Sequence, residues 1–194
     1  MKKEISDYIL GSIAVKENIV SDESIIAAIK KGATLIIEGY RRGNKLLAAG
    51  NGGSAADAQH LTAELVARFL FDRPALPALA LNTNTSTLTA VGNDYGYDDV
   101  FARQIYANAV KGDIFFGIST SGNSANILKA ITACKEKGVA AIGLTGSKPC
   151  KMDDLCDHMI KVPSTFTPHI QESHIMIIHL ICALVEKKLF GAEG

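Results

Sequence analysis

The sequence has no excess of charge of either sign, because 20 Lys and Arg residues balance 20 Asp and Glu residues over 194 positions. It also has no long basic run, whereas a protein that binds nucleic acid through phosphate contacts needs a positively charged face. We therefore expect no nucleic-acid partner. At first sight the same balance disfavours a strongly anionic small ligand.

Cysteine pairs, a secretory leader and a membrane-spanning run are absent as well. The four cysteines form no Cys-x-x-Cys pair, which is typical of reduced thiols. No small-residue cleavage site follows the uncharged stretch at 8–15. The longest apolar run near the C-terminus, 175–185, is too short to span a bilayer and contains His179. These absences predict a cytoplasmic protein with no membrane partner.

Hydrophobic residues make up 47% of the chain, which is enough to build the core of one domain. Apolar residues at helical spacing predict two helices over about 5–20 and 22–41. Beyond them, short apolar runs alternate with helical patterns. The runs lie at 45–49, 78–81, 113–118, 140–144 and 158–162, and the helical patterns at 55–71, from about 124 to 137, and at about 168–189.

Apolar strands that each lead into a helix are typical of a parallel sheet covered on both faces. We therefore predict an α/β fold, a three-layer sandwich with a central five-stranded parallel sheet, preceded by the two N-terminal helices. The chain has no linker long enough to separate domains. The expected organisation is a single domain over 1–194, with a helical hairpin at 1–43 and the sandwich at 44–194.

Two strand-to-helix loops have an unusual composition, at 50–54 and 119–124. Their glycines allow the backbone to approach a ligand closely, and helix N-termini offer unpaired N–H groups that suit phosphate. The composition of one such loop alone would be explained by the preference of Ser, Thr, Asn and Gly for turns and helix caps. Two of them, both after buried strands, favour a phosphate site. Its hydroxyl groups come from Ser119, Thr120, Ser121 and Ser124.

The ligand of these loops is expected to be a small phosphorylated molecule rather than a nucleotide. Gly50, Gly52 and Ala55 fit G-x-G-x-x-A, but the second strand ends in Asn82 where a dinucleotide site places an acidic residue. No Walker A lysine is present, so we expect no nucleotide cofactor. No Lys or Arg lies between Lys45 and Arg68, or between Lys111 and Lys129. Hydroxyls, N–H groups and helix dipoles are therefore expected to hold the phosphate.

Two pairs of residues have the spacing of one helix face: His60 with Glu64, and Gln171 with His179. Taken alone, the first pair is more often a surface contact, and His179 more often a core histidine. An aldose–ketose isomerase, however, needs such groups to move a proton between adjacent carbons. Glu64 and His179 are the candidate pair, and all four residues are candidate metal ligands, although Gln is unusual for zinc. Asn93-Asp94, in a turn-rich segment, is a candidate contact for sugar hydroxyls.

Four segments resemble the signatures of the phosphoheptose isomerases, within the sugar isomerase (SIS) domain superfamily. In chain order they are Gly50–His60, Val91–Asp94, Gly117–Ser124 and Ile170–His174. The resemblance covers essentially the whole chain, including the two leading helices. It implies a flavodoxin-like fold in a homotetramer, with active sites shared between subunits and the N-terminal hairpin used in oligomerisation.

The resemblance also implies an activity and a set of site residues. The reaction is conversion of sedoheptulose 7-phosphate to D-glycero-D-manno-heptose 7-phosphate, the first step toward ADP-heptose for lipopolysaccharide or capsule. The implied proton-transfer pair is Glu64 and His179. The implied phosphate ligands are Ser54, Ser119, Thr120, Ser121 and Ser124; the residues that line the sugar are Asn51, Gly52, Gly53, Asn93 and Asp94; and the zinc ligands are His60, Glu64, Gln171 and His179.

Small departures from the family pattern leave alternatives open. Asn84 stands where relatives often have Asp, and Pro168 where some have an acidic residue; both bear on substrate preference. One alternative is a non-catalytic superfamily member that binds the bacterial replication initiator, which need not keep an acid–base pair. Another is a superfamily enzyme that acts on an amino-sugar phosphate. Glu64 favours an enzyme over the regulator.

Overall fold

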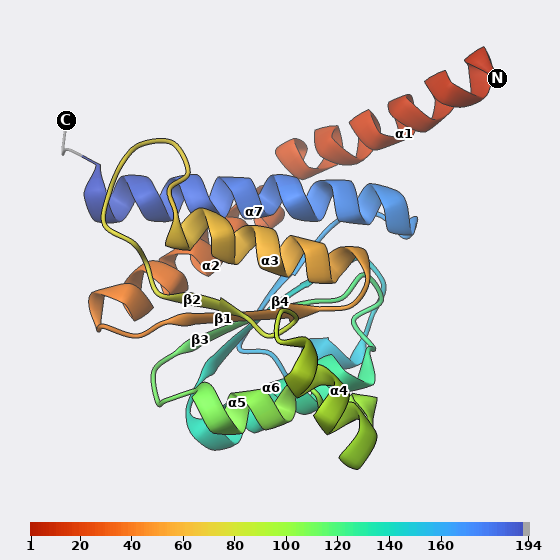
Figure 1. Ribbon diagram of the computed structural model, residues 1–194. Helices are drawn as coiled ribbons and strands as arrows, with labels where there is room; N and C mark the ends of the chain where they lie inside the picture. The colour runs from red at the N-terminus through yellow and green to blue at the C-terminus, as the bar shows by residue number, and fades with distance from the viewer. Residues whose placement is uncertain (192–194) are drawn as a thin grey trace.

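The computed structural model describes residues 1–191 and contains one sheet of five parallel strands (Figure 1). The strands follow the order β2-β1-β3-β4-β5, which is the flavodoxin-like order. Their bounds are β1 (Leu46–Gly50), β2 (Ala78–Ala80), β3 (Ile114–Ile118), β4 (Ala140–Thr145) and β5 (His158–Lys161). The helices are α1 (Lys2–Ser21), α2 (Glu23–Arg41), α3 (Gly53–Val66), α4 (Thr85–Asp94), α5 (Ala102–Asn108), α6 (Ala125–Lys137) and α7 (Thr167–Phe190), with short 3-10 helices η1 (Tyr97–Asp99) and η2 (Lys151–Asp154).

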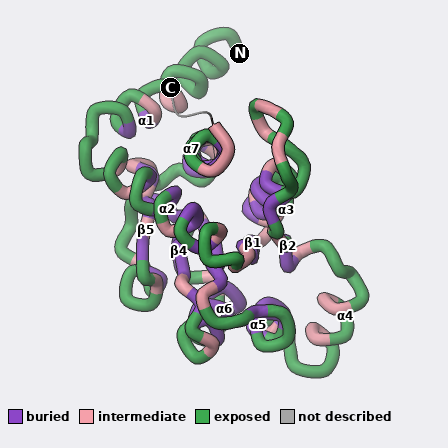
Figure 2. The backbone as a smooth tube through the Cα atoms, turned by 90° about the vertical axis from the view of Figure 1, so that its left-hand side faces the viewer, coloured by how far each residue is buried: buried purple, intermediate pink, exposed green. Residues whose placement is uncertain are grey.

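The helices form the two outer layers. Helices α2, α3 and α7 cover one face of the sheet, and α5 and α6 cover the other (Figures 1 and 2). Side chains of β1 alternate between the two layers: Leu46 and Ala48 belong to the core under α2, α3 and α7, whereas Leu47 and Ala49 belong to the core over α5 and α6. Both sides of the strand are buried, which is why its sequence is apolar without alternation. The predicted three-layer sandwich is confirmed.

Helix α1 leaves the body of the molecule, and only Val15 and Ile19 of its side chains are buried (Figure 1). It ends one residue before α2, and the Asp22 carboxylate between them accepts hydrogen bonds from the N–H groups of Ser24 and Ile25. This is the N-cap arrangement that starts a helix. Within residues 1–191, no helix combines the length and the hydropathy that crossing a bilayer would need.

The sequence prediction was wrong at three places. The third helix ends at Val66 rather than at residue 71, and helices α4 and α5 were not predicted. Asn93 and Asp94 therefore lie in the last turn of α4 and not in a turn-rich segment. Helix α4 has no fully buried residue. Only Leu88 and Val91 of this helix pack, partly buried, against the core within the described residues, and two apolar residues are too few for a sequence pattern to reveal.

A buried ion pair joins the end of α3 to α7. Arg73 Nε lies 3.1 Å from Glu186 Oε1, and both side chains are at most 2% exposed. The Glu186 carboxylate also accepts hydrogen bonds from the N–H groups of Phe69 and Leu70, at 2.9 and 2.7 Å. Arg73 donates to the carbonyl oxygen of Glu64, at 2.8 Å. The pair thus ends α3 and fixes its last turns against α7.

The surroundings of Glu186 keep it ionised. Burial by itself would raise the pKa of this carboxyl group, but the N–H groups of Phe69 and Leu70 and the Arg73 guanidinium outweigh it. The pKa of Glu186 therefore lies below its ordinary value of 4.5. A carboxyl group whose pKa is lowered on folding stabilises the fold above its unfolded pKa, and this contribution is lost as the pH falls through the folded pKa.

We expect Glu186→Gln to lower the free energy of unfolding by about 3–5 kcal/mol at neutral pH, because it leaves a buried guanidinium without its partner. Urea unfolding followed by circular dichroism measures this change. Glu38→Gln is the matched control, since Glu38 is exposed and makes no ion pair within residues 1–191; it should stay within about 0.5 kcal/mol of the parent.

The pH dependence follows from the lowered pKa. The difference in stability between the parent and Glu186→Gln should be fully present at neutral pH. It should shrink below about pH 4.5, where the carboxyl group of the unfolded parent becomes protonated, and continue to shrink as the pH falls through the lower pKa of the folded state. A difference that stays constant down to pH 3 would show that the charge of Glu186 contributes nothing.

Candidate functional site

The two loops predicted to bind phosphate lie side by side. Strand β1 pairs with β3 in parallel, with Gly50 opposite Ile118, so the loops that follow both strands leave the same edge of the sheet. The helices they enter, α3 and α6, lie on opposite faces (Figure 1). This is the switch point of a doubly wound sheet, where a crevice forms and ligands bind.

The first loop is shaped by its glycines. A Cβ atom on Gly50 would collide with the backbone carbonyl of Ser54, and Gly52 has a φ of +55°, a conformation that side chains disfavour. Asn82 holds the start of the loop: its Nδ2 donates to the Gly50 carbonyl at 2.7 Å, and its Oδ1 accepts from the Gly50 N–H at 3.3 Å. The amide at the end of β2 is therefore a structural clamp on the loop.

The hydroxyl groups of the second loop converge on one another. Ser119 Oγ lies 3.0 Å from Ser124 Oγ and 3.5 Å from Ser121 Oγ, and it accepts a hydrogen bond from the N–H of Gly122. Ser124 is the N-cap of α6, yet its side chain bonds no N–H group of that helix. The first N–H groups of α6 are thus left without a side-chain cap, which is the arrangement that binds anions.

A reciprocal pair of amides joins the two loops. Asn51 Nδ2 donates to Asn126 Oδ1, and Asn126 Nδ2 donates to Asn51 Oδ1, both at 2.9 Å. The Tyr97 hydroxyl of η1 also lies 3.5 Å from Asn51 Oδ1. Sequence analysis missed Asn126 and Tyr97, because neither stands within the two loops and a single asparagine in a helix gives no signal. Ser54, which the sequence analysis did select, is buried in the first turn of α3.

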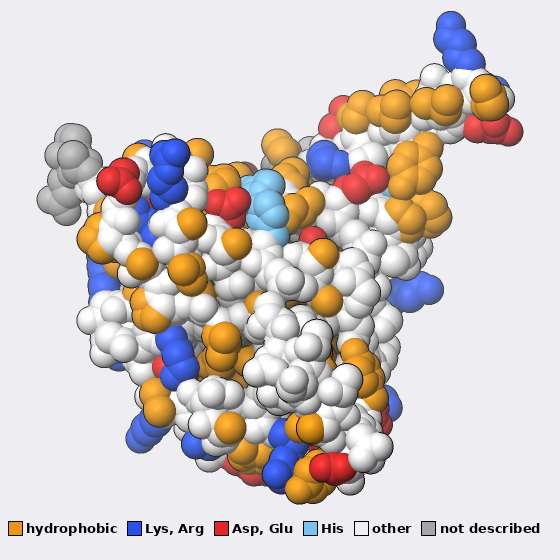
Figure 3. All heavy atoms as spheres, in the orientation of Figure 1, with side chains coloured by type: hydrophobic (Ala, Val, Ile, Leu, Met, Phe, Trp, Pro, Cys, Tyr) orange, Lys and Arg blue, Asp and Glu red, His pale blue; other side chains and the backbone are white. Residues whose placement is uncertain are grey.

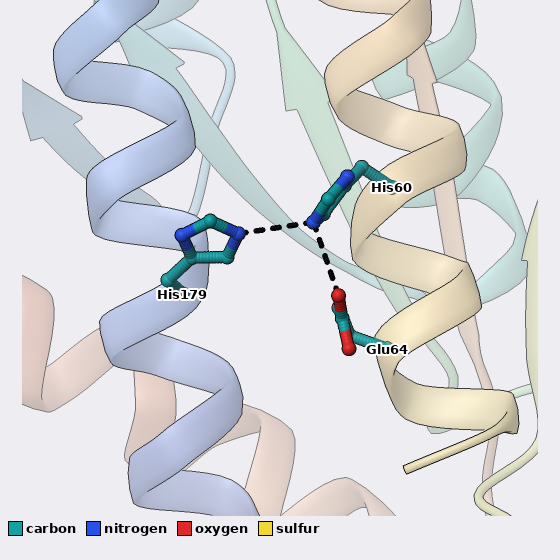
Figure 4. A group of neighbouring side chains, drawn as sticks. All are labelled: His60, Glu64 and His179. Atoms are coloured by element: carbon teal, nitrogen blue, oxygen red, sulfur yellow. Dashed lines mark hydrogen bonds and ion pairs between the residues drawn. The ribbon is translucent and has the colours of Figure 1, made fainter. Parts of the chain in front are cut away.

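Three of the predicted catalytic and metal-binding residues meet between α3 and α7 (Figure 4). His60 Nε2 lies 3.1 Å from Glu64 Oε1 and 2.9 Å from His179 Nε2. The His179 ring stacks on Phe69 with a centroid separation of 5.4 Å. Residues that are 119 positions apart in the sequence thus form one group. Sequence spacing relates residues within one helix only, so it could not predict that His60 and His179 meet.

The chemistry of this group fits a divalent metal ion. The ligand atoms of His60, Glu64 and His179 all lie within 4.8 Å of one another. Two imidazole nitrogens and one carboxylate oxygen form the His₂Glu set of catalytic zinc sites, which leaves a coordination position open. Gln171, the fourth predicted ligand, lies two turns before His179, and its amide faces the start of α3: a Cβ atom on Gly53 would be 2.6 Å from Gln171 Nε2.

Asp57 is a further titratable residue beside the group, one turn before His60 on α3. Burial raises the pKa of its carboxyl group to about 6, against a smaller lowering by His60. Its Oδ2 atom is buried without a hydrogen-bond partner within residues 1–191. Sequence analysis assigned Asp57 no role, because an aspartate in the first turns of a helix is ordinary.

Asn93 and Asp94 are not brought into this arrangement within the described chain. Both are exposed at the end of α4, and Asn93 Nδ2 donates to Asp94 Oδ1 at 2.8 Å. A cavity of about 210 Å³ does lie beside the second loop, and Thr120 and Ser121 are among its lining residues. The hydroxyls and the cavity thus lie at the second loop (119–124, the serine loop), whereas the His60–Glu64–His179 group lies further along α3.

Comparisons with known proteins agree with this geometry. Residues 7–146 match the SIS domain family. A phosphoheptose isomerase of Aneurinibacillus thermoaerophilus is 60% identical over 190 residues, which are 98% of this chain and 96% of the relative. Phosphoheptose isomerase 2 of Campylobacter jejuni is 58% identical over 97% of this chain and 96% of its own.

Solved structures give the same result for the fold. The phosphoheptose isomerase of Neisseria gonorrhoeae superposes with a TM-score of 0.90 at 39% identity, over 96% of this chain and 98% of the other. That of Francisella tularensis superposes with a TM-score of 0.91 at 35% identity, over 95% and 97% of the two chains.

The amide pair between the loops generates a prediction. Asn126 is 3% exposed and Asn51 is half-buried, so Asn126→Ala would leave the amide of Asn51 without its partner and should cost about 1–3 kcal/mol of stability. Urea unfolding measures the loss. Asn108→Ala serves as the control, because Asn108 is exposed and bonds only the Gln104 carbonyl of its own helix. Equal losses in the two variants would mean that the pair does not hold the loops together.

Proposed function

The chain is an isomerase that belongs to the phosphoheptose isomerases of the SIS domain family, and from that premise we propose that it converts sedoheptulose 7-phosphate into D-glycero-D-manno-heptose 7-phosphate. The observation that carries the proposal is the meeting of His60, Glu64 and His179 between α3 and α7. Helix α3 begins at the edge of the sheet where the hydroxyls of Ser119 and Ser124 converge. The product would supply ADP-heptose for lipopolysaccharide or capsule, and the cytoplasmic location expected from the sequence is part of the proposal.

The serine loop binds the phosphate in this proposal. The hydroxyls of Ser119, Ser121 and Ser124 already converge, so they need little rearrangement to surround an oxyanion. Thr120 and Ser54 complete the proposed phosphate-binding set. Fixing the phosphate positions the far end of the sugar, which lowers the entropic cost of bringing its reacting carbons to the catalytic groups. Asn51, Gly52, Gly53, Gln171, Asn93 and Asp94 complete the proposed sugar-binding set.

Glu64 and His179 move the protons. Isomerisation requires a base at the carbon that loses its proton and an acid at the neighbouring carbonyl oxygen, with an enediol or enediolate between the two states. We assign the base to Glu64, and the proton donor and acceptor at oxygen to His179. His60 touches both partners, at 3.1 and 2.9 Å, and therefore orients them relative to each other.

We propose that the metal is zinc, held by His60, Glu64 and His179 with the Gln171 amide as a fourth candidate. An oxygen of Glu64 or a nitrogen of His179 that binds zinc cannot accept a proton at the same time, so metal binding and proton transfer are alternative uses of that atom. A bound zinc ion would polarise the substrate's carbonyl group. The donor set of two imidazoles and a carboxylate supports this choice. Gln171 would have to turn its amide from Gly53 toward His179 on its own helix.

A homotetramer with shared active sites is the proposed assembly, and the N-terminal hairpin (1–43) is its proposed contact element beside the sandwich (44–194). Hydrophobic side chains are exposed along α1, among them Ile5, Ile9 and Leu10. Figure 3 shows a row of hydrophobic side chains on this helix, at the upper right. Exposed apolar surface of this kind marks protein contacts. Glu64 also lies three turns, roughly 16 Å, along α3 from Gly53, a separation that supports sharing the site between copies.

Glu64→Gln should lower isomerase activity by about 10²- to 10⁴-fold, because an amide cannot accept the proton from carbon. The assay is turnover of sedoheptulose 7-phosphate, with circular dichroism to verify folding and elemental analysis to verify metal content. Exchange of the C1/C2 proton with deuterated solvent should accompany turnover by the parent, as expected for an enediol route.

Glu38→Gln, at an exposed position on α2, is the control and should keep parental activity. Full turnover by Glu64→Gln would remove Glu64 as the base. Turnover of an amino-sugar phosphate in preference to the heptose phosphate would identify a different substrate, and a parent protein with no isomerase activity on either would favour the regulatory alternative.

The zinc proposal has a test independent of activity. Protein purified without chelators should contain about one zinc ion per chain, and His60→Ala should lose most of it, since it removes one of the two imidazole ligands. Gln59→Ala changes the exposed neighbour on the same helix and should retain the metal. Inductively coupled plasma mass spectrometry measures both. Equal metal content in the two variants would contradict the assignment.

A further inference from the structure

The cavity of about 210 Å³ beside the serine loop has walls from three separate connections. Thr120, Ser121 and Asn123 come from the loop after β3. Residues 146–149 come from the loop after β4, and residues 164–167 from the segment that leads into α7. All three connections leave the carboxyl edge of the sheet, so the cavity continues the crevice at its phosphate end.

The connection after β4 is fixed against the serine loop on both sides of Lys148. The Gly146 N–H donates to the Thr120 carbonyl at 3.2 Å, and the Met152 N–H donates to the Gly122 carbonyl, also at 3.2 Å. A Cβ atom on Gly146 would lie 3.1 Å from the same Thr120 oxygen, which is why this approach needs glycine.

Lys148 is the one cationic residue that lines the cavity in the part of the chain that the structure describes, and no carboxylate lines it there. Its ammonium group makes no ion pair or hydrogen bond within residues 1–191. The following Pro149 restricts the backbone of Lys148 to extended conformations. The side chain is exposed and unpaired within residues 1–191, and hydrogen bonds of Gly146 and Met152 hold the backbone on both sides of it against the serine loop.

The serine loop has no Lys or Arg near it in the sequence, between Lys111 and Lys129. Lys148 lines the cavity beside that loop from the connection that follows the next strand. Hydroxyls and N–H groups bind a phosphate whatever its charge state, but an ammonium group favours the dianion and attracts it from a distance.

We propose that Lys148 is a specificity-determining residue, whose ammonium group contacts the substrate's phosphate at the cavity beside Thr120 and Ser121 and makes binding depend on phosphate charge. The inference rests on the proposed function, because it takes the serine loop as the phosphate site. It adds to that function a charged group that selects phosphorylated sugars.

Lys148→Ala should raise the KM for sedoheptulose 7-phosphate about tenfold, at the low end of what a charged hydrogen bond contributes, because the side chain is exposed to solvent and salt. The kcat should stay within about twofold, since the ammonium group contacts the phosphate and not the reacting carbons. Lys148→Arg should recover most of the affinity, and the parent's KM should rise more steeply with ionic strength than that of Lys148→Ala.

Lys151→Ala is the matched control. Lys151 is an exposed lysine of the same segment whose side chain makes no ion pair within the described chain and does not line the cavity. It should keep the parental KM. Equal KM shifts in Lys148→Ala and Lys151→Ala would overturn the proposal, as would a fall in kcat at unchanged KM.

Calorimetric titration with inorganic phosphate separates this inference from the proposed function, because it needs no turnover. The parent and Lys151→Ala should bind phosphate more tightly than Lys148→Ala does. If the parent does not isomerise the heptose phosphate but this order of affinities holds, the proposed function fails and the role of Lys148 stands. If the parent is active and the three affinities are equal, the role of Lys148 fails alone.

Discussion

The parallel pairing of β1 with β3 is the constraint on which the rest of the molecule depends. It brings together two loops that are about 70 positions apart in the sequence and sends their helices to opposite faces of the sheet. A crevice opens at that edge because the two chain directions diverge there. The Asn51–Asn126 amide pair spans the crevice, so the fold sets the place of the site and two side chains set its width.

Much of this architecture could be predicted from the sequence, for local reasons. Buried strands that each enter a helix identified the sheet, and glycine and serine loops after two of them identified the crevice. What could not be predicted depends on contacts between distant residues. Helix α3 ends early because Glu186, more than 100 positions later, accepts the N–H groups of Phe69 and Leu70. The two histidines meet only because α3 and α7 pack side by side.

The zero net charge describes the whole surface and conceals how charge is distributed around the crevice. At the serine loop, hydroxyls and helix N–H groups act through dipoles, and in our proposal Lys148 adds one positive charge from a neighbouring connection. Along α3, His60, Glu64 and His179 supply groups that can exchange protons or hold a metal. A phosphate end without acidic lining and a proton-transfer end with a carboxylate suit the two ends of a phosphorylated sugar.

The proposed assembly bears on the proposed proton transfer at His60, Glu64 and His179. Leu180 and Leu184 on α7, with Val66 and Leu70 at the end of α3, are large apolar side chains that remain exposed near it, and Figure 3 shows histidine at the surface with hydrophobic side chains beside it. Water at such a group weakens electrostatic interactions and exposes an enediolate to side reactions. A second copy that covered these apolar side chains would exclude that water and gain binding energy from the same surface. In the proposed tetramer, such a contact would enclose the proton-transfer groups, in addition to the contact made by the N-terminal hairpin.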